Sequence, residues 1–146
     1  MKTLNTLILL PFILLMGACD ETKNVVDVAG SIQLTGEYSI TEITETMIEP
    51  NTLTLSLSAL DKSVRGHAGC NSFFGNYILD LYALSFNEFA ITEKYCDEPV
   101  MTVERAYLKA LHQTGSYSLQ DNILTLFSKV DRSVLLKARK NMKENN

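Results

Sequence analysis

Apolar and polar residues alternate along most of the chain, which is typical of strands with one buried and one exposed face. The clearest case is 52–58, where three leucines alternate with threonine and serine. Shorter patterns of the same kind predict further strands at 38–43, 64–68, 75–81, 84–87, 89–91, 116–119, 123–128 and 134–138. Polar and glycine-containing turns separate these segments, so we expect antiparallel pairing that ends in a closing meander.

One segment departs from this alternation and predicts a helix over 97–112. Its apolar residues have the spacing of a buried helical stripe: Val100, Val103, Tyr107, Ala110 and Leu111. Asp97 can cap the first turn, Pro99 suits that turn, and Gly115 is placed to end the helix. We therefore expect a mainly β (α+β) fold with one helix packed against the sheet.

Residues 1–18 have the pattern of a bacterial lipoprotein signal peptide. Lys2 supplies a positive charge, a short apolar run follows, and small residues precede Cys19. The run is shorter than the roughly 20 apolar residues needed to cross a hydrocarbon core. The stretch 16–19, Met-Gly-Ala-Cys, resembles the lipobox, whose cysteine is acylated and becomes the first residue of the mature chain. The resemblance implies a lipid at Cys19.

The remaining chain divides into three parts. Residues 19–33 begin with polar residues and predict a tether, in which the valines between 25 and 28 favour a short strand. The domain is expected over 34–138. The polar residues 139–146 predict a frayed tail.

Composition and charge limit the classes of function that fit the chain. A chain of 146 residues with 46% hydrophobic and 21% charged residues fits one folded domain. A net charge of -4 lacks the basic footprint of a nucleic-acid-binding protein. The acidic excess also does not favour electrostatic binding of the domain to anionic lipid. Attachment would therefore depend on acyl chains, with the domain in the bacterial cell envelope on the periplasmic face of a membrane. In enterobacterial lipoproteins an aspartate after the acylated cysteine favours the inner membrane, and Asp20 has that position.

Two cysteines remain in the expected mature domain. In an exported protein, Cys70 and Cys96 favour one disulfide. Free thiols are an alternative, as is a zinc site built from His67 and the two cysteines. The sequence has no CxxC or HxxxH spacing, so we expect no metal and no cofactor.

The segment 66–77 reads Gly-His-Ala-Gly-Cys-Asn-Ser-Phe-Phe-Gly-Asn-Tyr and matches every fixed position of the pattern G-x-x-G-C-N-x-x-x-G-x-Y. This pattern resembles the signature of the META domain family, which includes the heat-inducible HslJ-like bacterial lipoproteins. A second similarity is Thr92 four residues before Cys96, and the helix with Glu104 and Leu111 follows in the expected order.

The resemblance covers about 34–138 and implies a compact antiparallel domain, an incomplete β-barrel that holds one helix. It also implies a bond between Cys70 and Cys96. Members of the family are linked to heat response, antibiotic tolerance, motility and secretion, without an agreed biochemical activity.

The candidate binding residues lie within the signature or directly before it. Arg65, His67 and Asn71 suit a ligand site at the mouth of a barrel. The structural alternative is that Asn71 bonds to its neighbouring backbone in a tight turn, while the glycines allow close approach of strands.

Three classes of function follow from these observations. The first is a non-enzymatic envelope lipoprotein that binds a partner protein or an acyl chain, for example by strand addition at an open edge. The second is a small hydrolase that uses a thiol or another nucleophile, for which the sequence lacks a G-x-S-x-G, HExxH or phosphate-loop motif. The third is a membrane-proximal spacer or an inhibitor of an envelope-targeting enzyme.

Overall fold

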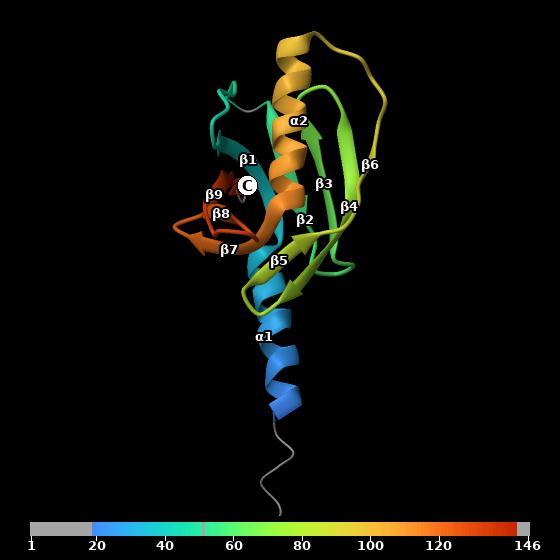
Figure 1. The fold of residues 1–146 in the computed structure, drawn as a ribbon. Coiled ribbons are helices and arrows are strands. Elements are labelled where there is room, and N and C mark those ends of the chain that lie inside the picture. The colour runs from blue at the N-terminus through green and yellow to red at the C-terminus, as the bar shows by residue number, and fades with distance from the viewer. Residues whose placement is uncertain (1–18, 51, 143–146) are drawn as a thin grey trace, which may run out of the picture.

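A computed structural model describes residues 19–50 and 52–142 of the protein. The expected leader, 1–18, and the last residues of the expected tail, 143–146, lie outside the described part. Figure 1 shows the arrangement of the elements. They are α1 (Cys19–Leu34), β1 (Gly36–Ile43), β2 (Leu53–Leu57), β3 (Ser63–Ala68), β4 (Ser72–Asp80), β5 (Ala83–Phe86), β6 (Ala90–Ile91), α2 (Glu98–Gln113), β7 (Thr114–Gln120), β8 (Ile123–Ser128) and β9 (Val134–Lys140).

The strands close into a barrel. Their order is β3-β2-β1-β9-β8-β7-β5-β4, and pairing of β3 with β4 completes the ring. Short β6 pairs with β4 beside β5. The expectation of an incomplete barrel is therefore wrong, although two neighbouring strands of the ring share little backbone pairing. Within the described residues, β5 and β7 pair at Ala83 and Ser116 alone.

The strands agree closely with the alternation in the sequence. The pattern at 52–58 forms β2, whose leucines are buried while Thr54 faces solvent. The strand expected at 75–81 begins earlier, at Ser72, and every second residue of β4 is buried. The expectation of a frayed tail is wrong for 139–140, because β9 continues to Lys140 and pairs with β1 and β8.

The segment 19–34 is a helix, which corrects two expectations. The valines between 25 and 28 belong to α1 and form no strand, and the fold has a second helix besides α2. The last turn of α1 packs against the end of the barrel where β1 begins (Figure 1). Leu34 is fully buried there, and its carbonyl accepts a hydrogen bond from the Tyr38 hydroxyl at 2.7 Å.

The same turn of α1 connects strands from different sides of the barrel. Gly30 faces Leu79 of β4 and Tyr117 of β7, two strands that lie on either side of β5. The Nζ atom of Lys140 in β9 donates to the Gln33 carbonyl at 2.8 Å, near the C-terminal end of the helix, where a cation is favoured. The C-terminal turn of α1 is thus part of the folded domain.

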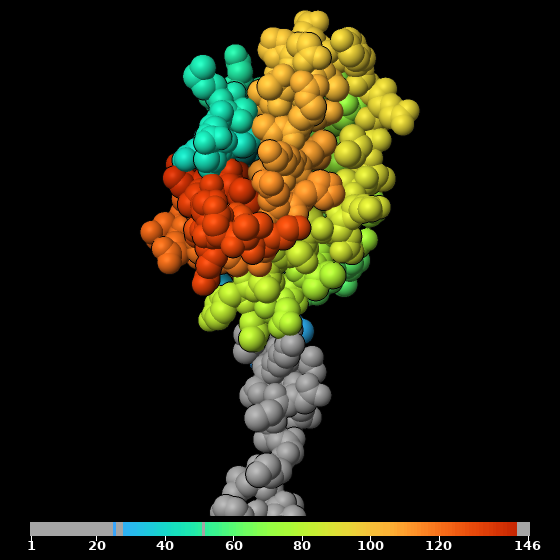
Figure 2. All heavy atoms as spheres, viewed as in Figure 1, coloured from blue at the N-terminus to red at the C-terminus, as the bar shows by residue number. Residues whose placement is uncertain are grey.

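The second helix, α2, packs across the other end of the barrel. Figure 2 shows it between the closing strands and the β4–β6 strands. Tyr107 and Leu111 of the predicted stripe are fully buried, whereas Val100 is more than a third exposed. The Tyr107 hydroxyl donates to the Thr54 carbonyl of β2 at 3.0 Å, and burial raises the pKa of this hydroxyl.

The ends of α2 lie within a residue or two of the predicted ones. Asp97 is the residue before the first turn, as expected, but its side chain makes no capping bond; its carbonyl accepts the Val100 N–H at 3.0 Å. The helix ends at Gln113, and Gly115, the expected terminator, lies inside β7.

Large apolar side chains fill the interior of the barrel. The largest fully buried ones are Tyr38, Tyr107, Leu34, Ile40, Leu53, Leu55, Leu57, Leu84, Leu111, Leu124, Leu126 and Leu136. They come from both helices and from β1, β2, β5, β8 and β9, and further buried residues of β3 and β4 join them, so burial of one shared core stabilises the fold.

Gly66 shows how tightly the strands pack around this core. Its partners across the strands are Leu55 and Phe73. A Cβ atom at this position would lie 2.1 Å from the Thr54 carbonyl oxygen and 2.6 Å from the Phe73 ring. The backbone oxygen cannot move without breaking the pairing of β2 with β3, so only glycine fits.

We predict that Gly66→Ala lowers the free energy of unfolding by about 3 kcal/mol, because overpacking must separate β2 from β3. The matched control is Gly30→Ala, whose Cβ atom would lie 3.3 Å from the flexible ends of Leu79 and Tyr117. We expect the control to change the free energy by less than about 1 kcal/mol. Urea denaturation followed by circular dichroism measures both, and similar losses in the two variants would contradict the assignment.

Candidate functional site

Cys70 and Cys96 form a disulfide with their Cα atoms 6.0 Å apart. The bond joins the turn after β3 to the segment just before α2. It closes a loop with a sequence separation of 26, which contributes about 3.5 kcal/mol on the chain-entropy model. The paired sulfurs offer no thiolate to a metal, and within 19–50 and 52–142 no group of three or more His, Cys, Asp or Glu could hold one.

Asn71 lies directly beside the disulfide, and its side chain is fully hydrogen-bonded. Its Nδ2 donates to the Glu104 Oε1 at 2.9 Å and to the Lys94 carbonyl at 3.1 Å. Its Oδ1 accepts from the Thr92 hydroxyl at 2.8 Å and from the Lys94 N–H at 2.7 Å. The Asn71 side chain therefore joins three segments of the chain, instead of bonding to its own turn, and has no hydrogen bond left for a ligand.

Glu104 is the partner that sequence reasoning did not single out as a site residue. It is 5% exposed, and its Oε2 accepts the Asn71 backbone N–H at 2.7 Å. Both carboxyl oxygens therefore accept from one residue that is distant in the sequence. The available signal was its position between Val103 and Tyr107, because a charged residue within an apolar stripe needs a buried partner.

The other two candidate residues, Arg65 and His67, lie elsewhere. The inward positions of β3 are Val64 and Ala68, so both side chains point to the outer face of the sheet. They line a groove of about 420 Å³ on the side of the barrel and not at its mouth. Other residues lining this groove are Glu37, Thr54, Ser56 and Asn141. The structure thus keeps Arg65 and His67 together and separates them from Asn71.

A second hollow, of about 470 Å³, lies between the segment after β1 and the first turns of α2. Most of its lining is apolar: Met47, Ile48, Leu53, Pro99, Val100 and Val103. Met47 is almost fully exposed. A hollow of this size and character suits an aliphatic or aromatic group.

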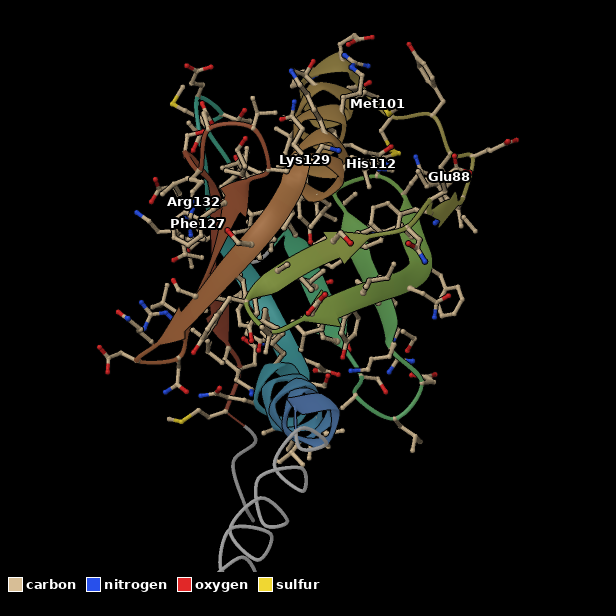
Figure 3. All side chains as sticks on the ribbon, turned by 60° about the horizontal axis from the view of Figure 1, so that its bottom comes forward. Glu88, Met101, His112, Phe127, Lys129 and Arg132 are labelled. Carbon is tan, nitrogen blue, oxygen red and sulfur yellow. A yellow bond between two sulfur atoms is a disulfide. The ribbon has the colours of Figure 1, made fainter. Side chains whose placement is uncertain are left out.

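The second histidine of the chain, His112, belongs to the last turn of α2 and does not line the groove with His67. Figure 3 labels it at the C-terminal end of α2, with Lys129 beside it. Its ring lies 5.2 Å from that of Phe89, and Lys129 Nζ donates to its carbonyl at 3.4 Å. These contacts secure the end of the helix, where positive charge is favoured.

We predict that Glu104→Gln lowers the free energy of unfolding by about 2–3 kcal/mol, because the new amide nitrogen would face an N–H donor of Asn71. The control is Glu98→Gln, which breaks an exposed ion pair with Arg105 at 2.9 Å and should change it by less than about 0.5 kcal/mol. Both are measured by denaturation under non-reducing conditions. Equal effects would show that the Asn71–Glu104 contacts do not stabilise the fold.

Comparisons with known proteins place this geometry in a family. A solved NMR structure of a protein from Burkholderia xenovorans is similar, with a TM-score of 0.62 and 22% identity over 80% of this chain and 89% of that chain. A crystal structure of a DUF4847 family protein from Bacteroides vulgatus has a TM-score of 0.58 and 12% identity over 77% of this chain and 97% of that one. These likenesses show the fold.

No protein of curated function matches the chain significantly. The family model of the META domain matches residues 31–141, which includes the whole barrel and the disulfide. The chain therefore belongs to the META domain family.

Proposed function

We propose that the protein is a membrane-anchored lipoprotein of the bacterial cell envelope whose barrel is a non-enzymatic binding module. The observation that carries the proposal is the geometry of α1. Its C-terminal turn packs against the barrel, and Cys19, the expected acylation site, is its first residue at the other end. The 16-residue helix is about 24 Å long, and residues 19–30, which precede its docked last turn, would hold the barrel about 18 Å from a lipid on Cys19.

The helix would act as a spacer of fixed length, where the sequence suggested a loose tether. No helix in the described part of the chain is long and apolar enough to span a membrane. Attachment would then depend on acyl chains, several of which anchor a protein stably. Asp20 favours the inner membrane in enterobacterial lipoproteins, and we extend that to this chain as part of the proposal.

The disulfide supports both parts of the proposal. Disulfides persist in oxidising compartments such as the periplasm, which fits an exported domain. The bond also occupies the two cysteines that a thiol-dependent hydrolase would need, so it favours binding over catalysis. The partner would be an envelope protein or an acyl chain, for which the hollow beside Met47 and Val100 has a suitable apolar lining. Its physiological setting would be the stress, motility or secretion processes linked to the family.

We predict that the native protein, extracted from membranes, has the mass of a chain that begins at Cys19 and carries acyl groups. Cys19→Ser should abolish the acyl mass and release the protein from the membrane fraction. The matched control, Cys70→Ser, should stay acylated and membrane-bound while losing the disulfide. Intact mass spectrometry without reductant and membrane fractionation measure these outcomes. A native protein without acyl groups would contradict the anchor.

A further inference from the structure

We propose that the outer face of β1–β3 binds a short zwitterionic peptide, with Arg65 contacting its carboxylate and Glu37 contacting its ammonium group. The inference rests on the proposed binding role and gives it a location and a class of ligand. Binding in the groove does not depend on the lipid at Cys19, so the two proposals can fail separately; only the choice of a peptide over a lipid headgroup uses the spacing by α1.

The register of the strands places opposite charges in one row. Glu37 of β1 pairs with Ser56 of β2, and Ser56 pairs with Arg65 of β3. Residues directly opposite on neighbouring strands point to the same face of a sheet. Two strand spacings separate the backbones of Glu37 and Arg65 by about 10 Å. The row therefore has a charged side chain at each end. Ser56 between them is short, so the space above it is open and forms part of the groove of about 420 Å³.

These charges have no partner among residues 19–50 and 52–142. Among the residues that the structure describes, neither Glu37 nor Arg65 takes part in a side-chain hydrogen bond or ion pair. A pair on the same sheet shows the contrast: Glu42 of β1 is directly opposite Lys137 of β9, and the two form an ion pair at 2.8 Å. Opposite charges one strand apart meet directly, whereas those of Glu37 and Arg65 are separated by β2.

The arrangement favours a ligand that carries both charges. An anion bound at Arg65 would also be repelled by the negative charge of Glu37. A cation bound at Glu37 would also be repelled by the positive charge of Arg65. A guanidinium binds a carboxylate through two parallel hydrogen bonds, and His67 lies next to Arg65 on the same face of β3. The Asn141 backbone N–H donates to the Glu37 carbonyl at 2.7 Å, so Asn141 borders the groove at its acidic end.

The spacing also limits the length of the ligand. An extended peptide advances about 3.3 Å per residue, so two or three residues fit between side chains whose backbones are about 10 Å apart. Ethanolamine phosphate, as in a lipid headgroup, has similar charges, but α1 would hold the barrel away from the bilayer, so we assign the site to a peptide.

The test is a titration of the 15N-labelled full-length protein, extracted from its membrane, with three probes. These are tri-alanine, N-acetyl-tri-alanine, which lacks the ammonium group, and tri-alanine amide, which lacks the carboxylate. We expect tri-alanine to shift the backbone amide signals of Ser56, Arg65 and His67 saturably, with a dissociation constant in the millimolar range for so exposed a site. Each blocked peptide should bind at least about threefold more weakly.

Variants assign each charge to one end of the peptide. Arg65→Ala should make tri-alanine and its amide bind equally, and Glu37→Ala should do the same for tri-alanine and its N-acetyl form. The control is Arg139→Ala on the outer face of β9, which pairs with Ser39 and does not line the groove, and it should leave all three constants unchanged.

Three results would overturn the proposal: equal binding of all three probes to the native protein, equal weakening by Arg139→Ala, or tighter binding of glycerophosphoethanolamine than of tri-alanine. The last would assign the groove to a lipid headgroup. Failure of the titration would leave the acyl anchor untouched, whereas loss of acylation would leave the titration unchanged.

Discussion

The closure of the barrel at β5 and β7 is the constraint on which the rest of the structure depends. One residue pair, Ala83 with Ser116, joins these strands in the described part of the chain. A seam of that length cannot hold a ring by backbone hydrogen bonds alone, so packing must hold it. α2 packs against β5 and β8 above the seam, and Gly30 of α1 faces strands on both sides of β5 below it. The two helices at opposite ends of the barrel thus have one structural role.

The sequence predicts most of the strands because alternation of apolar and polar residues depends on burial alone, and β2 and β4 have it over their whole lengths. It fails for α1, because short valine-containing stretches favour strands locally, while the helix depends on docking of Leu34 into the core. The role of Asn71 is missed for a similar reason. Its partner Glu104 lies 33 residues away, so only the packed structure brings the two together. Of the candidate site, Arg65 and His67 were predictable as a pair, but the opposing charge of Glu37 needed the strand register.

The residues that stabilise the barrel and those of the proposed binding groove lie in different parts of the structure. The disulfide and the Asn71–Glu104 contacts lie where α2 packs, at the end far from α1, and they use every hydrogen-bonding group of the Asn71 side chain. The groove with Arg65 lies on the outer wall, where the side chains of Glu37, Ser56 and Arg65 do not contribute to the core. Substitutions at Glu37 or Arg65 can therefore change which ligand binds without loss of the fold, because both side chains lie on the outer face of the sheet. In the proposed anchored protein, α1 would orient this wall at a set distance from the bilayer.

Hydrogen exchange at β5 and β7 in two variants of α1 tests directly whether the helix supports the seam. Leu34→Ala removes a fully buried side chain of the docked turn, whereas Ile32→Ala removes one that is 63% exposed on the same helix. Because docking of α1 supports the seam, we expect faster exchange of the β5 and β7 amides in Leu34→Ala and unchanged exchange in Ile32→Ala. Equal exchange in both variants would show that the seam closes without the helix.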